Sequence, residues 1–191
     1  MPRLFTAIEI PEIVSDELLD LQEPLAGAKW IDADNYHLTL RFVGDIDNRI
    51  AQEFTANLAG IMADAFELRI TGLGAFGGND PKSVWAGLDP SPQLDALARA
   101  HERAARNAGI PPVKHAFKPH ITLARLRYSS PEAVAQFLTR FGGYRSELFV
   151  VTRFVLMSSK PSTGGGPYVV EEEFLLSGGG YMIEDDNDAA W

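Results

Sequence analysis

Two short segments of this sequence are near copies of each other: His37-Leu-Thr-Leu-Arg-Phe42 and His120-Ile-Thr-Leu-Ala-Arg125. In each, a histidine is followed by one apolar spacer and then by a threonine within an apolar run. Side chains of a strand alternate between its faces, so each His and Thr share one face while the spacers point into a core. Two such strands brought together would place two imidazoles and two hydroxyls in one cleft. That set of groups suits acid–base chemistry on a phosphate.

The elements expected around the motifs occur twice in the same order: helix, His-Thr strand, helix, strand, strand. After a first strand at 3–10, the first unit comprises 11–23, 36–43, 47–61, 65–72 and 83–88. The second unit comprises 92–108, 118–125, 131–141, 146–157 and 167–176. Duplicated units commonly pack about a pseudo-two-fold axis, so we expect the two motif strands to meet at the centre of the molecule.

Length and composition indicate one domain. The chain has 191 residues, and its hydrophobic fraction of 46% is enough for a proper interior. We expect a single bilobal domain over 1–177, made of halves at about 1–90 and 91–177. From 178 to 191, glycines are followed by the acidic run Glu184–Asp188, which predicts a flexible tail.

The composition also excludes several classes of protein. Without cysteine, the chain has no disulfide, thiol nucleophile or cysteine-based zinc site. A net charge of −9 argues against a binder of duplex DNA and against a membrane-surface role. No segment approaches the roughly 20 apolar residues of a membrane span, and Glu9 and Pro11 interrupt the apolar start. We therefore expect a cytoplasmic protein that contacts at most a terminus or a few nucleotides of nucleic acid, and we expect it to be a monomer.

Alternation of side chains along a strand places the two motif arginines on different faces relative to their motif histidines and threonines. Arg41 falls in phase with His37 and Thr39, so parity favours it as the phosphate ligand. Arg125 falls out of phase with Thr122 and would need a bulge at Ala124 to reach the cleft.

The other histidines and the nearby aromatic residues have simpler interpretations. His101 lies on an apolar helix stripe and is expected to be structural, and His115 lies in a loop at the surface. Three aromatic residues near the motifs are candidates for stacking on a base, with a core position as the alternative: Tyr36, Phe42 and Tyr168.

Two other catalytic classes compete with this interpretation. Two histidines on separate strands can bind zinc, but catalytic zinc usually has three protein ligands and no carboxylate falls in phase beside either motif. A serine hydrolase is disfavoured because the sequence has no Gly-x-Ser-x-Gly elbow.

At these residues the chain resembles the 2H phosphoesterase superfamily, which is defined by two His-x-Thr/Ser motifs. It is most similar to the bacterial and archaeal RNA 2′,3′-cyclic phosphodiesterases, also called 2′-5′ RNA ligases. The resemblance runs over about residues 3–176. The segments that carry it are Arg3–Ile8, Asn35–Gly44, Gly72–Phe76 and Phe117–Arg125.

The resemblance implies an α+β fold with two pseudo-symmetric lobes around a central cleft, each an antiparallel sheet with helices outside. It implies hydrolysis of a 2′,3′-cyclic phosphate to a 2′-phosphomonoester without a metal or other cofactor. His37 matches the proton donor and His120 the proton acceptor. Thr39 and Thr122 match the motif threonines.

The resemblance also places a family arginine at Arg125, against the parity argument, so both Arg41 and Arg125 stay candidates for phosphate binding. The expected partners are RNA 3′ ends or small nucleotides that carry a 2′,3′-cyclic phosphate. Two alternatives remain open: 2′-5′ ligation, and a module that binds nucleotides or RNA ends with little turnover.

Overall fold

A computed structural model describes residues 3–159 and 167–178 of the chain. The acidic tail expected from the sequence lies beyond residue 178 and is therefore outside the described residues. The helices are α1 (Glu12–Leu19), η1 (Ala33–Asn35), α2 (Asn48–Ala59), α3 (Pro92–Asn107) and α4 (Pro131–Phe141). The strands are β1 (Arg3–Glu9), β2 (Ala28–Trp30), β3 (His37–Asp45), β4 (Phe66–Leu68), β5 (Ile70–Phe76), β6 (Ser83–Leu88), β7 (Ile121–Leu126), β8 (Phe149–Val151), β9 (Arg153–Ser159) and β10 (Tyr168–Leu175).

The helices begin where local chemistry favours a start. Ser91 and Ser130 each accept a hydrogen bond from a backbone N–H of the first turn, and each is followed by proline at the first helical position. Asp47 caps α2 in the same way. These side chains satisfy backbone donors that a helix leaves open at its N-terminus. They explain why α3 and α4 match the ranges expected from the sequence.

The main sheet has the strand order β10-β9-β1-β3-β7-β6-β5, with β2 paired to β7. In the duplicated unit β1 corresponds to β6, β3 to β7 and β9 to β5. The second unit therefore begins with β6, whereas the sequence pattern assigns the strand at 83–88 to the end of the first unit. When each strand is replaced by its counterpart, the order from β9 to β5 is therefore unchanged whichever end it is read from. The remaining equivalent pair, β4 and β8, forms a separate two-stranded sheet. The sheet is pseudo-symmetric, and the two motif strands lie at its centre.

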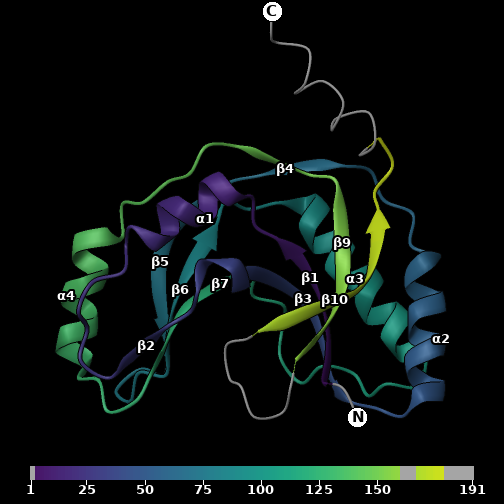
Figure 1. Cartoon of the computed structure of the whole chain (residues 1–191), viewed down its shortest axis with the longest axis horizontal. Coiled ribbons are helices and arrows are strands. Elements are labelled where there is room, and N and C mark those ends of the chain that lie inside the picture. Colours follow the sequence, from purple (N-terminus) through teal and green to yellow (C-terminus); the bar gives the residue numbers. More distant parts are fainter. Residues whose placement is uncertain (1–2, 160–166, 179–191) are drawn as a thin grey trace, which may run out of the picture.

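The two lobes do not coincide with the two halves of the sequence. β5, from the first unit, pairs with β6 on the side of β7, whereas β9, from the second unit, pairs with β1 on the side of β3. Likewise α3 packs against β3 and α4 against β5. Figure 1 shows α4 at one end of the molecule beyond β5, and α2 at the other end. Each lobe is therefore completed by the other half of the chain.

β3 and β7 join the lobes through the antiparallel pair Leu38 and Ile121. Both side chains are fully buried in the main hydrophobic core, which also receives residues from α1, α2 and α3. The spacer residues of the two motifs thus anchor the strands in the interior, as the sequence pattern predicts. The opposite faces of the two strands are left for the cleft.

None of the helices within 3–159 and 167–178 is both long and apolar enough to cross a bilayer.

Candidate active site

The strand register brings the four motif side chains together. Because Leu38 lies opposite Ile121 in an antiparallel pair, the register sets His37 beside Thr122 and Thr39 beside His120. All four residues are partly exposed, whereas the two spacers between them are buried. Segments that are 83 residues apart along the chain therefore meet on one face, as the repeated motif predicts.

A β-bulge follows the threonine in both motif strands. In β3, Ala7 and Thr6 pair with Thr39 and Arg41, so one extra residue is accommodated at Leu40. In β7 the same shift separates the partners of Trp85 and Val84, which are Thr122 and Ala124. The bulge turns two consecutive side chains after the threonine away from the cleft. The next side chain then points into the cleft again.

The bulge decides where each motif arginine lies. The prediction from parity that Arg41 shares the face of His37 and Thr39 is wrong, because the bulge at Leu40 reverses the alternation. Arg41 is only 6% exposed, and Phe42 takes the cleft position instead, with 49% exposure. The Arg41 Nε donates to Glu102 at 2.6 Å and Nη2 donates to the Pro111 carbonyl at 2.6 Å. Its guanidinium joins β3 to α3 and the loop that follows, and we no longer assign it to phosphate.

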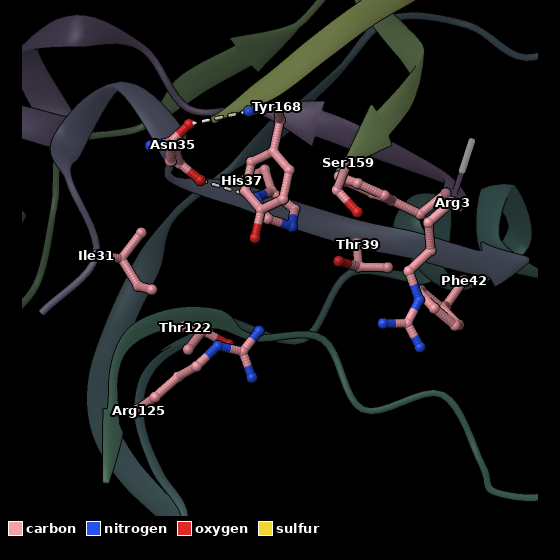
Figure 2. Close-up of a pocket in the computed structure, with 11 residues that line it drawn as sticks. Arg3, Ile31, Asn35, His37, Thr39, Phe42, Thr122, Arg125, Ser159 and Tyr168 are labelled. Carbon is pink, nitrogen blue, oxygen red and sulfur yellow. Dashed lines mark hydrogen bonds between the residues drawn. The ribbon is translucent and has the colours of Figure 1, made fainter. Parts of the chain in front are cut away.

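Arg125, in contrast, lies in the cleft. Strict alternation after Thr122 would point it away, and the bulge at Ala124 brings it back to the cleft face. Figure 2 shows its guanidinium below His37 and Thr39, across the pocket from Arg3. The pocket has a volume of about 180 Å³. It is lined by Arg3, Phe5, Ile31, Asn35, His37, Thr39, Phe42, Thr122, Arg125, Ser159 and Tyr168. This lining contains two arginines and no carboxylate, so the pocket favours an anion although the chain as a whole is acidic.

Both motif histidines are held by the same hydrogen bond. Nδ1 of His37 lies 2.8 Å from the Asn35 carbonyl, and Nδ1 of His120 lies 2.7 Å from the Lys118 carbonyl. A carbonyl only accepts, so each Nδ1 donates and each neutral imidazole keeps its lone pair on Nε2. In Figure 2 the second ring nitrogen of His37 points into the pocket. Each ring is thereby oriented to exchange a proton through Nε2.

Aromatic rings support each imidazole. His37 lies against Phe5 and Tyr168, with ring centroids 5.0 and 4.9 Å away. His120 lies edge-on to Phe76 at 4.9 Å. Trp85 is the second ring beside His120, with its centroid 6.2 Å away. The two sites therefore repeat a histidine with two aromatic neighbours.

Gly74 makes the second aromatic support possible. It lies opposite Trp85 in the β5–β6 pair. A Cβ at this position would lie 2.3 Å from an indole carbon, so any larger residue would displace the ring. The same indole and Phe76 carry the Lys118 ammonium, which lies 5.2 and 5.1 Å from their centroids. The Gly72–Phe76 segment thus shapes the wall behind His120.

Burial lowers the pKa of His37 below its usual value of 6.5, and the positive charges of His120 and Arg125 lower it further. The hydrogen bond to the Asn35 carbonyl acts in the opposite direction. In the protein without a bound anion, these effects bias His37 toward the neutral form. The influence of His120 and Arg125 on the pKa of His37 also reflects how closely the two motifs approach each other.

His120 lines the cavity next to the pocket of His37. This second cavity has a volume of about 550 Å³ and shares Thr39 with the first. Its wall includes the basic residues Lys118, His115 and Arg99 and the carboxylates Asp95 and Glu102. Arg41, which Glu102 binds, also borders this second cavity but not the pocket of His37. The two imidazoles therefore line neighbouring cavities that meet at Thr39.

The remaining candidate residues separate into core and site. His101 is fully buried against Phe154, its Nδ1 donates to the Leu97 carbonyl, and burial lowers its pKa to about 4, so it is structural as predicted. Tyr36 is buried, and its hydroxyl accepts a hydrogen bond from Gln22. Phe42 and Tyr168 line the pocket.

Sequence reasoning did not select Arg3, Asn35 or Ser159 as site residues. Arg3 looks like the solvated start of a strand, and only the pairing of β1 between β3 and β9 brings it to the pocket. Within the described ranges no three His, Asp or Glu side chains gather in an arrangement that would hold a metal ion.

Comparison with known proteins gives consistent matches. The family model LigT like Phosphoesterase matches residues 8–86 and 88–168. An Aquifex aeolicus protein named RNA 2′,3′-cyclic phosphodiesterase is 30% identical over 84% of this chain and 88% of its own length. A protein of the same name from Aeropyrum pernix is 37% identical over 52% of this chain, and the match spans 57% of that protein.

Solved structures match over nearly the whole chain. E. coli LigT complexed with 3′-AMP is 26% identical, has a TM-score of 0.75, and is matched over 93% of this chain and 99% of that chain. A Thermus thermophilus protein, TT0787, also has a TM-score of 0.75 and 26% identity, with 91% of this chain and 97% of that chain covered.

Proposed function

The chain belongs to the LigT-like phosphoesterase family of the 2H superfamily, and from this premise we propose that it is an RNA 2′,3′-cyclic phosphodiesterase. The reaction is hydrolysis of the cyclic phosphate to a 2′-phosphomonoester by two histidines, without a metal. The observation that carries this proposal is the pairing of the two His-Thr strands at Leu38 and Ile121, which sets the four polar side chains on one face.

The proposed reaction needs a proton acceptor and a proton donor on opposite sides of phosphorus. Neutral His120 takes a proton from water through Nε2, and that water attacks phosphorus. The bond from phosphorus to the ribose 3′-oxygen breaks, and protonated His37 gives its proton to the departing oxygen. Attack and departure lie roughly in line. The ribose therefore lies on the side of His37, and the water enters from the side of His120.

The groups between the histidines suit the charge that develops on the phosphoryl oxygens. The hydroxyls of Thr39 and Thr122 lie on the shared face, and the Arg125 guanidinium points into the same pocket. Donors fixed in advance stabilise a transition state without reorganising during the reaction. Arginine adds a planar fork that matches two phosphate oxygens.

The lowered pKa of His37 opposes a role as proton donor in the empty site, but the substrate reverses the effect. A cyclic phosphate diester carries a negative charge, and a negative charge beside an imidazole favours its protonated form. Binding of the substrate anion thus raises the pKa of His37 where a donor is needed. Without substrate, the protein thus avoids the cost of burying a protonated His37.

The substrate class follows from the reaction. A 2′,3′-cyclic phosphate requires a ribose 2′-oxygen, so the substrate is RNA or a ribonucleotide and not DNA. The names of the Aquifex and Aeropyrum relatives support RNA, and the E. coli LigT structure with 3′-AMP supports a site that takes a nucleotide.

The test is product analysis with a short RNA that ends in a 2′,3′-cyclic phosphate. We expect conversion to the 2′-phosphate, with no loss of rate in the presence of a chelator. The His37→Ala/His120→Ala double variant should convert no more substrate than a reaction without protein. A 3′-phosphate product would contradict the assignment of the leaving oxygen. Activity lost to a chelator and restored by zinc would favour metal catalysis, and binding without conversion would favour a binding module. A longer RNA in place of the hydrolysis product would identify a ligase.

A further inference from the structure

We propose that Arg3 binds the phosphodiester immediately 5′ to the cyclic phosphate, so that the cleft is built for an RNA chain in preference to a cyclic mononucleotide. The inference rests on the proposed function and extends it from the reacting phosphate to the next one. Arg3 lies at the start of β1, two strands away from β7, and reaches the same pocket as Arg125.

The Arg3 guanidinium is positioned but not neutralised. It lies 5.3 Å from the centroid of the Phe42 ring, so the aromatic face supports it from one side. Asp45 is its register partner across β1 and β3, yet within residues 3–159 and 167–178 no carboxylate lies within ion-pair distance of Arg3. Arg41 and Arg153, in contrast, are both paired with glutamates. A cation held on a ring inside a pocket without carboxylates is suited to an anion from outside the protein.

The pseudo-symmetry shows that Arg3 is not a second copy of Arg125. The fifth residue after the motif histidine is Arg125 in one strand and Phe42 in the other. In the lobe of His37 the cation therefore comes from the neighbouring strand β1 and lies against the Phe42 ring. Figure 2 shows the two guanidinium groups on different sides of the pocket, with Thr39 near Arg3 and Thr122 near Arg125. Two separate cations indicate two anionic groups on the ligand.

The direction of the reaction says which anion meets Arg3. The departing 3′-oxygen belongs to the ribose, so the ribose lies on the side of His37, in the pocket that Arg3 lines. A cyclic mononucleotide carries a single phosphate, which the histidines, the threonines and Arg125 already surround. In an RNA chain the next anion attached to this ribose is the phosphodiester at its 5′-oxygen. Arg3 is the cation of the pocket that remains for it.

The experiment compares two substrates: a cyclic mononucleotide, and a dinucleotide that ends in the same 2′,3′-cyclic phosphate. For the unaltered protein we expect kcat/KM to be higher for the dinucleotide. Arg3→Gln should lower kcat/KM for the dinucleotide by about 10–100-fold, as expected for loss of a charged hydrogen bond, and lower the mononucleotide value by much less. Arg3→Lys should restore part of the difference. Arg49→Gln, an exposed arginine on α2, is the matched control and should change neither substrate.

A binding arm separates this inference from the proposed function, because it needs no turnover. The ligands are a dinucleotide and a mononucleotide that each end in a 2′-phosphate, titrated at several salt concentrations. Arg3→Gln should reduce the slope of log K against log salt by about 0.7 for the dinucleotide, which is the share of one phosphate contact on a single strand. If the unaltered protein hydrolyses neither substrate, the proposed function fails, and this slope still decides the role of Arg3.

Two results would overturn the inference. Equal losses on both substrates in Arg3→Gln would mean that Arg3 holds the reacting phosphate. A loss confined to the dinucleotide in Arg99→Gln, which lines the cavity of His120, would mean that the chain leaves on the opposite side.

Discussion

The strands β3 and β7 share a plan and differ at one position. A histidine stands at the start of β3 and directly before β7, and each donates from Nδ1 to the carbonyl two residues earlier. Each strand bulges after its threonine. The arginine is the fourth residue after the histidine in β3 and the fifth in β7. Because the bulge buries the fourth residue and exposes the fifth, Arg41 binds Glu102 whereas Arg125 enters the cleft. A shift of one residue thus separates an arginine that lines the cleft from one that supports the fold.

The surroundings of the two imidazoles also differ. His37 lies in the smaller pocket, where burial lowers its pKa. His120 lines the larger cavity beside Lys118. Under the proposed mechanism, the smaller pocket would hold the ribose and the larger one would admit water. The duplication therefore supplies two similar strands, and their surroundings give them different roles.

The largest effect should come from removing what the two strands share. His37→Ala and His120→Ala should each lower kcat on a cyclic phosphate substrate by about 10²–10⁴-fold, because each removes one proton transfer. The double variant should lose less than the product of the single losses, since both histidines act on one transition state. Stopped-time assays with separation of the products measure all three. A near-normal rate in either single variant would show that its histidine carries no proton transfer.

The next effect should come from the position at which the strands differ. Arg125→Gln should lower kcat by about 10²–10³-fold, as for other fixed donors to a developing oxyanion, and should leave the unfolding midpoint nearly unchanged. Arg41→Gln should show the reverse pattern. It should lower the free energy of unfolding by about 1–3 kcal/mol, because Glu102 and two backbone carbonyls lose their donor. Denaturant titration beside the rate assay checks both, and a large loss of kcat in well-folded Arg41→Gln protein would restore Arg41 to the site.

A smaller effect should come from the wall behind His120. Gly74→Ala places a methyl group where the Trp85 ring lies, so the ring must move and His120 loses its support. We expect kcat to fall by up to about 10²-fold, the loss that a displacement of about 1 Å can cause. Gly143→Ala, where a Cβ has open space, is the control. Equal rates for the two variants would show that the aromatic wall does not orient His120.

The smallest effect is a shift in titration. NMR of the imidazole protons should show His37 of the free protein titrating below 6.5, because burial and nearby cations disfavour its charged form. Arg125→Gln removes one of those cations, so the pKa of His37 should rise, and added phosphate should raise it in the unaltered protein. Arg127→Gln lies outside the pocket and should have no such effect. A pKa of His37 that stays constant in Arg125→Gln would show that the charge of Arg125 does not act on His37.

Much of this architecture was predictable from sequence because local chemistry fixed it. The caps at Ser91 and Ser130 located α3 and α4, and the repeated His-Thr pattern predicted that the two motif strands would meet. The strand expected from residue 118 begins instead at Ile121, since Pro119 has no N–H to donate to a sheet. The three-residue strand β2 was not predicted, because so short a run has no periodicity of its own.

What could not be predicted depends on pairing between distant strands. The bulge at Leu40 arises from the register of β3 with β1, and strict alternation along β3 alone gave the wrong face for Arg41. For Arg125 the sequence could state that a bulge was needed, but only the register with β6 provides it. The interleaving of the two halves in the sheet is equally invisible in an ordered list of elements.

The central claim is that the two imidazoles exchange protons on opposite sides of one phosphorus atom. The most direct test is the pH dependence of kcat/KM for the unaltered protein and for each single histidine variant. We predict a bell-shaped profile for the unaltered protein. His120→Ala should lose the rise on the acid side, which reports a base, and His37→Ala should lose the fall on the alkaline side, which reports an acid. Loss of the same limb in both variants, or an unchanged bell in either, would contradict the claim.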